Sequence, residues 1–147
     1  MTKQLPLGIY TFDELITENY LYIDKTEYIY QLVSQAKYYF LSRPRRFGKS
    51  LLLSTLKAIF EGKKELFKGF ALENKEYNWK KYPVIHIELG SKKVYKADDL
   101  KQFLTNQINF TAQRYGITLS IDSYEERFHE LIRKLSAKGK VVILIDE

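Results

Sequence analysis

The sequence contains no cysteine, and only one methionine, one tryptophan and three prolines among its 147 residues. Without cysteine the chain forms neither disulfide bonds nor a thiolate metal site. No apolar run approaches the roughly 20 residues that a membrane-spanning helix requires. The first ten residues, MTKQLPLGIY, also lack the apolar stretch of a secretory signal peptide. We therefore expect a cytoplasmic protein that has no membrane partner.

Apolar, aromatic and basic residues, in contrast, are plentiful. Hydrophobic residues make up 45% of the chain and aromatic residues 15%, a composition typical of a globular protein. At 147 residues the chain is long enough to bury the core of one compact domain. The formal net charge of +6 makes nucleic acid a candidate partner.

Tyrosine and tryptophan interleave with the lysines in the middle of the chain, at Tyr77, Trp79, Tyr82 and Tyr95. Such a mixture is suited to single-stranded nucleic acid, which it contacts through stacking and charge. A solvated, lysine-rich surface explains the same residues. Because charge alone is not a specific signal, we favour this second interpretation.

Residues 37–60 read KYYFLSRPRRFGKSLLLSTLKAIF, which predicts a strand over 37–42, a basic turn, and a helix from about Lys49 to Glu61. A strand that passes to a helix through Gly48-Lys49-Ser50 is the pattern of a phosphate-binding loop. The triplet alone arises by chance in roughly one chain in ten to twenty of this length. A basic surface turn is therefore the alternative, and the strand-turn-helix context favours the phosphate loop.

In this interpretation Lys49 and Ser50 lie at a helix N-terminus, where free backbone N–H groups and the helix dipole favour an anion. The full pattern is G-x-x-x-x-G-K-[ST], and its first glycine falls on Arg43. Arginine fits there only if the backbone keeps an ordinary conformation, because positive φ is the property that glycine supplies. We therefore expect a negative φ at Arg43.

A second motif ends the chain. Residues 141–145 are continuously apolar, which predicts a parallel strand covered on both faces, and Asp146 and Glu147 follow at its carboxyl end. Ligands of open α/β sheets bind at that end. We predict that Ser50 and Asp146 hold Mg²⁺ and that Glu147 acts as general base. The alternative, a strand that ends in acidic loop residues, is disfavoured by the order and spacing of the two motifs.

The remaining patterns predict alternating elements. Besides residues 37–42 and 141–145, a strand is expected over residues 84–89, with short helices between 63 and 80 and a longer helix through residues 100–115. The order β, α, β, α, α, β predicts an α/β fold with a parallel sheet. Three helix starts are expected from capping boxes, formed by Thr11 with Glu14, Asp24 with Glu27, and Asp122 with Glu125.

Three stretches resemble the bacterial AAA-ATPase-like family, which is related to AAA+ and archaeal-type ATPases. They are Tyr22 with Asp24-Lys25-Thr26, the run from Phe40 to Ser50 that contains Arg-Pro-Arg-Arg-Phe-Gly-Lys-Ser, and residues 79–89. The likeness covers nearly the whole chain and implies a three-layer P-loop NTPase fold. It also implies that arginine at position 43 is usual in this family. Many members end in a domain similar to PD-(D/E)XK nucleases, and no nuclease activity is carried over to this chain.

The resemblance also implies that the sheet is incomplete. In AAA+-like folds the strand between the loop strand and the acidic strand comes later in the sequence. We therefore expect free strand edges that favour self-association, and a truncated reading frame or fragment. The expected organisation is a helical lead-in over residues 1–36 and a partial ATPase core over residues 37–147.

The expected function is Mg²⁺-dependent ATP binding, with ATP hydrolysis in a complete chain. Lys49 and Glu147 are the predicted catalytic residues, and Ser50 and Asp146 the predicted Mg²⁺ ligands. The rival is a basic module that binds nucleic acid or protein and turns over no nucleotide. The predicted nucleotide-binding residues are Arg45, Arg46, Phe47, Gly48, Lys49, Ser50 and Leu51.

Overall fold

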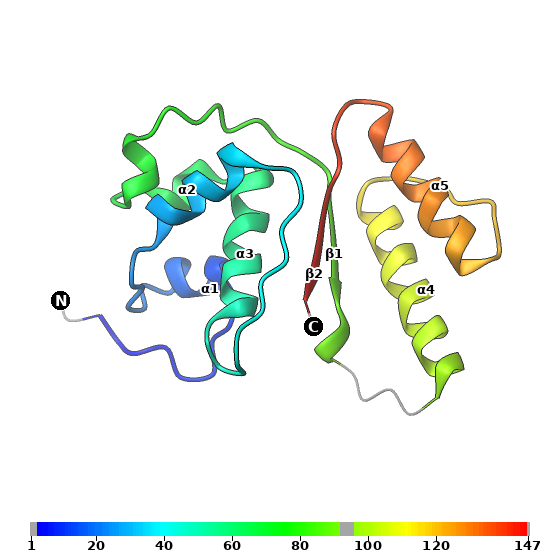
Figure 1. Ribbon diagram of the computed structural model, residues 1–147, viewed down its shortest axis with the longest axis horizontal. Coiled ribbons are helices and arrows are strands. Elements are labelled where there is room, and N and C mark those ends of the chain that lie inside the picture. Colours follow the sequence, from blue (N-terminus) through cyan, green and yellow to red (C-terminus); the bar gives the residue numbers. More distant parts are fainter. Residues whose placement is uncertain (1–2, 92–95, 147) are drawn as a thin grey trace. The chain divides into compact units, whose positions relative to one another are not determined.

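The computed structural model describes residues 3–91 and 96–146 (Figure 1). The chain divides into two compact units, Met1–Lys81 and Tyr82–Glu147, and each is described by itself. The boundary predicted between residues 36 and 37 stays a prediction. No helix in the described part of the chain is both long and apolar enough to cross a membrane.

The first unit is helical. Its described residues, 3–81, form three α-helices and two short 3₁₀ helices, with one isolated bridge between Gln4 and Tyr20. Its elements are α1 (Phe12–Thr17), α2 (Thr26–Gln35), α3 (Lys49–Phe60), η1 (Lys64–Phe67) and η2 (Ala71–Asn74). The predicted phosphate-loop helix is thus present as α3, and the short helices expected between residues 63 and 80 are confirmed as η1 and η2.

Aromatic rings form the centre of this unit. Phe12 and Phe67 are fully buried, and their ring centroids lie 4.8 Å apart. Tyr22 packs edge-on against Phe12, with 5.2 Å between the centroids, and also against Phe70. Such pairs add a preferred geometry to the burial of apolar area. The core therefore joins α1, η1 and the segment that precedes α2.

The strand predicted over residues 37–42 is wrong. This segment belongs to no strand, and Tyr38 and Phe40 are 91% and 88% exposed. A strand exists only through a partner that takes up its backbone N–H and C=O groups. The described residues supply no such partner here. The apolar character of residues 37–42 is compatible with a strand, but it does not provide the neighbouring strand that a sheet requires.

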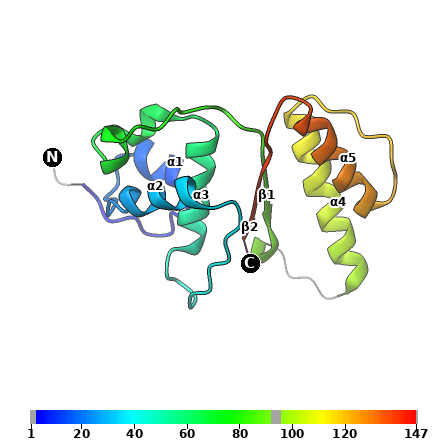
Figure 2. The same cartoon turned by 45° about the horizontal axis from the view of Figure 1, so that its top comes forward.

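In the described residues of the second unit, two α-helices pack against a small parallel sheet (Figure 2). Strand β1 pairs with β2 in a register that runs from Val84 opposite Val142 to Glu88 opposite Asp146. Its elements are β1 (Val84–Glu88), η3 (Leu89–Ser91), α4 (Ala97–Arg114), α5 (Tyr124–Ser136) and β2 (Val142–Asp146). The parallel pairing bears out an α/β arrangement, and the three-layer P-loop architecture stays a prediction.

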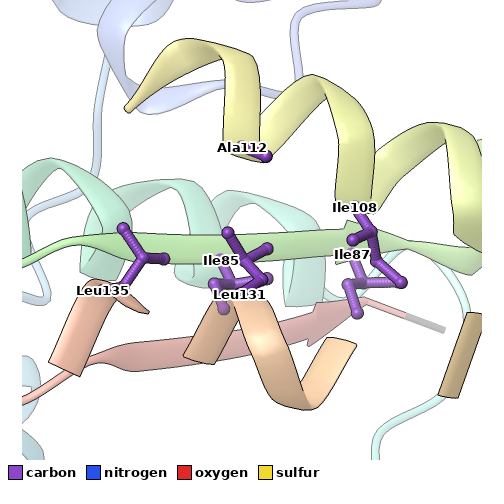
Figure 3. Packing of buried hydrophobic residues seen from close by; sticks show 6 residues of the cluster. All are labelled: Ile85, Ile87, Ile108, Ala112, Leu131 and Leu135. Carbon is purple, nitrogen blue, oxygen red and sulfur yellow. The ribbon is translucent and has the colours of Figure 1, made fainter. Parts of the chain in front are cut away.

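The core of the second unit lies between β1 and the two helices (Figure 3). Ile85 and Ile87 point from alternate positions of β1 to the same side, as the period of two along a strand requires. On that side they meet residues of α4 and α5. The buried cluster comprises Ile85, Ile87, Ile108, Ala112, Leu131 and Leu135.

Strand β2 is less covered than its apolar sequence predicted. Ile143 and Ile145 are 41% and 56% exposed, whereas Leu144 between them is buried. Among the described residues β2 pairs with β1 alone, so its other edge is free. In the ladder Ile143 and Ile145 lie opposite Ile85 and Ile87, but the buried cluster against α4 and α5 includes no residue of β2, so the prediction of burial on both faces is not met.

None of the three predicted capping boxes forms, although Thr11 is the N-cap of α1 as expected. Helix α5 begins after Ser123, one residue later than the box of Asp122 with Glu125 requires. Helix α2 begins after Lys25, and Asp24 bonds Thr26 instead of closing a box with Glu27. At α1 the Thr11 hydroxyl reaches the Glu14 carboxylate at 3.3 Å, with no side-chain bond to the backbone.

Helices α3 and α4 both end in a glycine with a left-handed backbone. Gly62 has φ +72° and Gly116 has φ +66°. At α3 the Gly62 N–H bonds the Ile59 carbonyl and the Lys63 N–H bonds the Ala58 carbonyl. This pair of bonds is the Schellman motif, which satisfies the last carbonyls of a helix.

Candidate phosphate-binding loop

The turn between residues 43 and 48 has an alternating backbone. Arg46 has φ +65° and Gly48 has φ +74°, while Phe47 between them keeps a negative φ. Residues of alternating hand turn their backbone N–H groups toward one side and create a concavity suited to an anion. Gly48 also precedes α3, whose first bond joins the Leu52 N–H to the Gly48 carbonyl. The N–H groups that come before this bond have no acceptor within the helix.

The lysine of the motif folds back over this turn. The Lys49 ammonium donates a hydrogen bond of 3.0 Å to the Arg43 carbonyl oxygen. The Arg43 backbone has a negative φ, as expected from the sequence, so arginine at this position carries no left-handed strain. The lysine thus closes the turn through its bond to the residue that begins the motif.

The loop is open to solvent and strongly basic. Arg45, Arg46 and Ser50 are exposed, and Phe47 is 63% exposed. Lys49 and Leu51 are partly buried. The structure therefore brings the seven predicted nucleotide-binding residues, 45–51, together on one turn and the first turn of α3. Their positive charge and accessibility suit a phosphorylated ligand.

Buried side chains on α3 hold the loop to the rest of the first unit. The Ser54 hydroxyl accepts the Phe12 N–H at 2.9 Å and donates to the Leu51 carbonyl at 2.9 Å. Thr55 is fully buried, and a side-chain hydrogen bond joins it to Tyr22. Burial raises the pKa of Tyr22, so its hydroxyl stays protonated well above neutral pH. Helix α3 is therefore fixed by polar contacts as well as by apolar packing.

Asp24, in the Asp-Lys-Thr run, fastens the start of α2. Its carboxylate accepts the Thr26 N–H at 2.8 Å, the Thr26 hydroxyl at 2.7 Å and the Ala71 N–H at 2.8 Å. Burial raises the pKa of this carboxyl, but the bonds from Ala71 and Thr26 outweigh it and leave the pKa below its ordinary value. Both oxygens are thus engaged with the protein, and the residue acts as a tie between α2 and η2.

The acidic motif belongs to the second unit. Asp146 is the last residue of β2, lies opposite Glu88 across the parallel pair, and is partly buried. It was expected just beyond the strand, and the ladder extends one residue further than the apolar run. Glu147, the predicted general base, lies outside the described residues. The structure thus describes Asp146 within its own unit, and Lys49 and Ser50 within theirs.

Sequence reasoning missed two features of the loop. The left-handed Arg46 has no signal in the sequence, because the loop pattern leaves that position unspecified. The hydrogen bond from the Phe12 N–H to the Ser54 hydroxyl joins residues 42 positions apart, and a serine within a helix gives no indication of such a partner. A serine on the buried face of a helix is the nearest available signal, since a buried hydroxyl requires a hydrogen-bond partner.

The comparisons with known proteins bear on the family. A family model described as "Predicted AAA-ATPase" matches residues 6–147. The chain belongs to the AAA-ATPase-like family. The resemblance carried by the Arg-Pro-Arg-Arg-Phe-Gly-Lys-Ser run is therefore confirmed, and arginine at position 43 stands in a member of that family.

A relative from Azotobacter chroococcum mcd 1, an "Uncharacterized protein in vnfD 5'region", is 40% identical to this AAA-ATPase-like chain over 149 residues. The alignment covers 99% of this chain and 29% of the relative. No solved structure matches the chain. The chain thus spans less than a third of the length of this relative. Any activity that depends on the rest of such a longer protein is therefore treated below as a proposal.

Proposed function

We propose that the chain binds ATP together with Mg²⁺ through the loop at residues 43–51. The observation that carries this proposal is the alternation of left-handed Arg46 and Gly48 in front of α3. In the proposed complex the backbone N–H groups from Arg46 to Ser50 surround the β-phosphate. Lys49 exchanges its bond with the Arg43 carbonyl for the β- and γ-phosphates. Membership in the AAA-ATPase-like family supports the same assignment.

The proposed Mg²⁺ ligands are the Ser50 hydroxyl and the Asp146 carboxylate. Oxygen ligands of this kind suit Mg²⁺, which keeps several waters and needs few protein groups. Ser50 is exposed at the first turn of α3, and Asp146 is at the carboxyl end of β2, so each lies where its type of motif presents a ligand. When bound, the ion neutralises phosphate charge.

Hydrolysis is proposed for the whole protein. In this proposal Glu147 orients the attacking water, and Arg45 and Arg46 add contacts to the phosphates. Arg46 adopts its left-handed backbone at a cost of roughly 1–2 kcal/mol, which glycine would not incur. A phosphate contact by the guanidinium would explain why a side chain is retained at this position.

The test is ATP titration by calorimetry with and without Mg²⁺, comparing Lys49→Ala with Lys57→Ala. Both lysines lie on α3 and both changes remove one charge, but Lys57 is in the last turn. Loss of a charged hydrogen bond of about 1.5–3 kcal/mol predicts roughly 10- to 150-fold weaker ATP binding for Lys49→Ala alone. Equal affinities of the two variants would refute the assignment.

Titration of the chain with an oligonucleotide, alongside the ATP titration, distinguishes ATP binding from the rival function. A nucleic-acid module would bind a single-stranded oligonucleotide with strong salt dependence and without regard to ATP. The exposed Tyr38 and Phe40 beside Arg43 and Arg45 are the residues that favour this candidate. Salt-sensitive oligonucleotide binding by a chain that fails to bind ATP would replace the ATP proposal with this one.

A further inference from the structure

The segment between η2 and β1 folds back onto the C-terminal end of α3. Gly62 there leaves no room for a side chain, since a Cβ would lie 2.9 Å from the Trp79 carbonyl oxygen and 2.8 Å from Lys81 Cγ. Gly62 therefore has two independent requirements, a left-handed backbone and the absence of a side chain. Residues 79–81 occupy the space that any other residue at position 62 would need.

Trp79 fixes this contact from the other side. It is a non-glycine residue with φ +50°, an unfavourable conformation that persists only when the surroundings hold it. Its ring lies 5.1 Å from the Phe67 ring and 5.3 Å, edge-on, from the Tyr77 ring. Packing of the indole against the buried Phe67 offsets the backbone cost.

A continuous set of contacts joins this segment to α3. Trp79 packs on Phe67, Phe67 packs on Phe12, and the Phe12 N–H bonds Ser54 of α3. Next to Gly62, Lys63 bridges Asp13 at 2.6 Å and Glu61 at 3.1 Å. These contacts place residues 79–81 and α3 in one packed network of the first unit, and coupling between two sites is carried by networks of this kind.

Helix α3 has the candidate phosphate loop at its start and this contact at its end, roughly 18 Å apart for a 12-residue helix. The boundary between the two compact units falls directly after Lys81. We propose that residues 75–81 form a latch on the end of α3, and that ATP bound at the start of α3 holds the latch closed. The latch thus couples nucleotide occupancy to the segment that leads into the second unit. This inference rests on the proposed function.

Trypsin cleavage after Lys80 and Lys81 measures opening of the latch, because a protease acts on a locally opened, extended backbone and the closed latch holds the adjacent Trp79 in a left-handed conformation packed on Phe67. If opening disrupts the nucleotide site, ATP at ten times its Kd slows cleavage about tenfold, in proportion to 1 + [ATP]/Kd. Gly62→Ala forces the latch open, so cleavage becomes fast and insensitive to ATP. Gly69→Ala is the matched control, since Gly69 lies in the same unit with φ +84° and nothing within 4 Å of its Cβ position.

A second variant guards against simple misfolding of Gly62→Ala. Trp79→Gly removes the ring and relieves the left-handed strain, so cleavage after Lys80 becomes faster while circular dichroism keeps its helical signal. Cleavage of the wild type that is unaffected by ATP, in a chain that binds ATP by calorimetry, would overturn the latch and leave the proposed function intact. Equal cleavage of Gly62→Ala and Gly69→Ala without nucleotide would also overturn it. Absence of ATP binding by calorimetry would instead refute the proposed function, and the coupling with it.

Discussion

Replacing Ser54 by alanine tests how α3 is held. The Ser54 hydroxyl is the acceptor for the Phe12 N–H, and Phe12 is fully buried. Without the hydroxyl this N–H is left without its acceptor in the core, which costs about 1–3 kcal/mol. Alanine recovers roughly 0.5 kcal/mol through its higher helix propensity. We therefore expect Ser54→Ala to lower the free energy of unfolding by about 0.5–2.5 kcal/mol.

The control is Thr17→Ala in the same unit. Thr17 is exposed, and its hydroxyl donates to the Asp13 carbonyl at 2.8 Å, so its removal leaves no buried group unpaired. Its effect should stay within about 0.5 kcal/mol. The chain has a single tryptophan, Trp79, which lies in the first unit and gives a fluorescence signal for unfolding of that unit in urea.

The two variants should therefore differ in urea midpoint at a constant slope. Amide hydrogen exchange adds a local measurement, because the Phe12 amide should exchange faster in Ser54→Ala and at the wild-type rate in Thr17→Ala. Equal midpoints for the two variants, with unchanged exchange at Phe12, would refute the role assigned to Ser54.

Two further predictions concern carboxylates. Lys134, 2.8 Å from the buried Glu130, is the main cause that lowers the pKa of Glu130 from 4.5 to about 2, with bonds from Ser120 adding to it. The stability that this carboxylate contributes is therefore complete above pH 4.5 and lost as pH falls through about 2. The thermal midpoint should fall less between pH 5 and pH 2 in Glu130→Gln than in the wild type. Parallel plots of midpoint against pH for the two proteins would contradict this. Asp24→Ala should lower the free energy of unfolding by about 1 kcal/mol, because Thr26 and Ala71 lose the acceptor of their hydrogen bonds. A changed ATP Kd in this variant would show that Asp24 serves the nucleotide site.

Periodicity and strand character made much of the fold predictable. Helix α3 and strands β1 and β2 appear within about one residue of the expected positions. Apolar residues of α3 and β1 are buried, and β2 forms because it pairs with β1. Residues 37–42 have the same apolar and aromatic character and form no strand. The difference lies in the partner, since a strand depends on a second segment that local sequence does not specify.

The candidate loop was predictable in its residues and not in its backbone. Gly48, Lys49 and Ser50 predicted the turn correctly, because glycine readily adopts the positive φ that the residue before α3 has. The left-handed Arg46 and the hydrogen bond from the Phe12 N–H to Ser54 depend on how distant parts of the unit fold around α3. Glu130 was missed for the same reason, because its partners Ser120 and Ile121 lie in a preceding loop that the structure folds against α5.

The hydrogen bond from Lys49 to the Arg43 carbonyl also has a kinetic consequence. It closes residues 43–49 into a ring before any ligand arrives, so the entropy of ordering this turn is lost during folding and not during association. When an anion arrives, Lys49 exchanges the neutral Arg43 carbonyl for a charged acceptor, and the backbone does not have to rearrange first. Association should therefore proceed in a single observable phase whose rate rises linearly with ligand concentration, as expected for a preformed receptor.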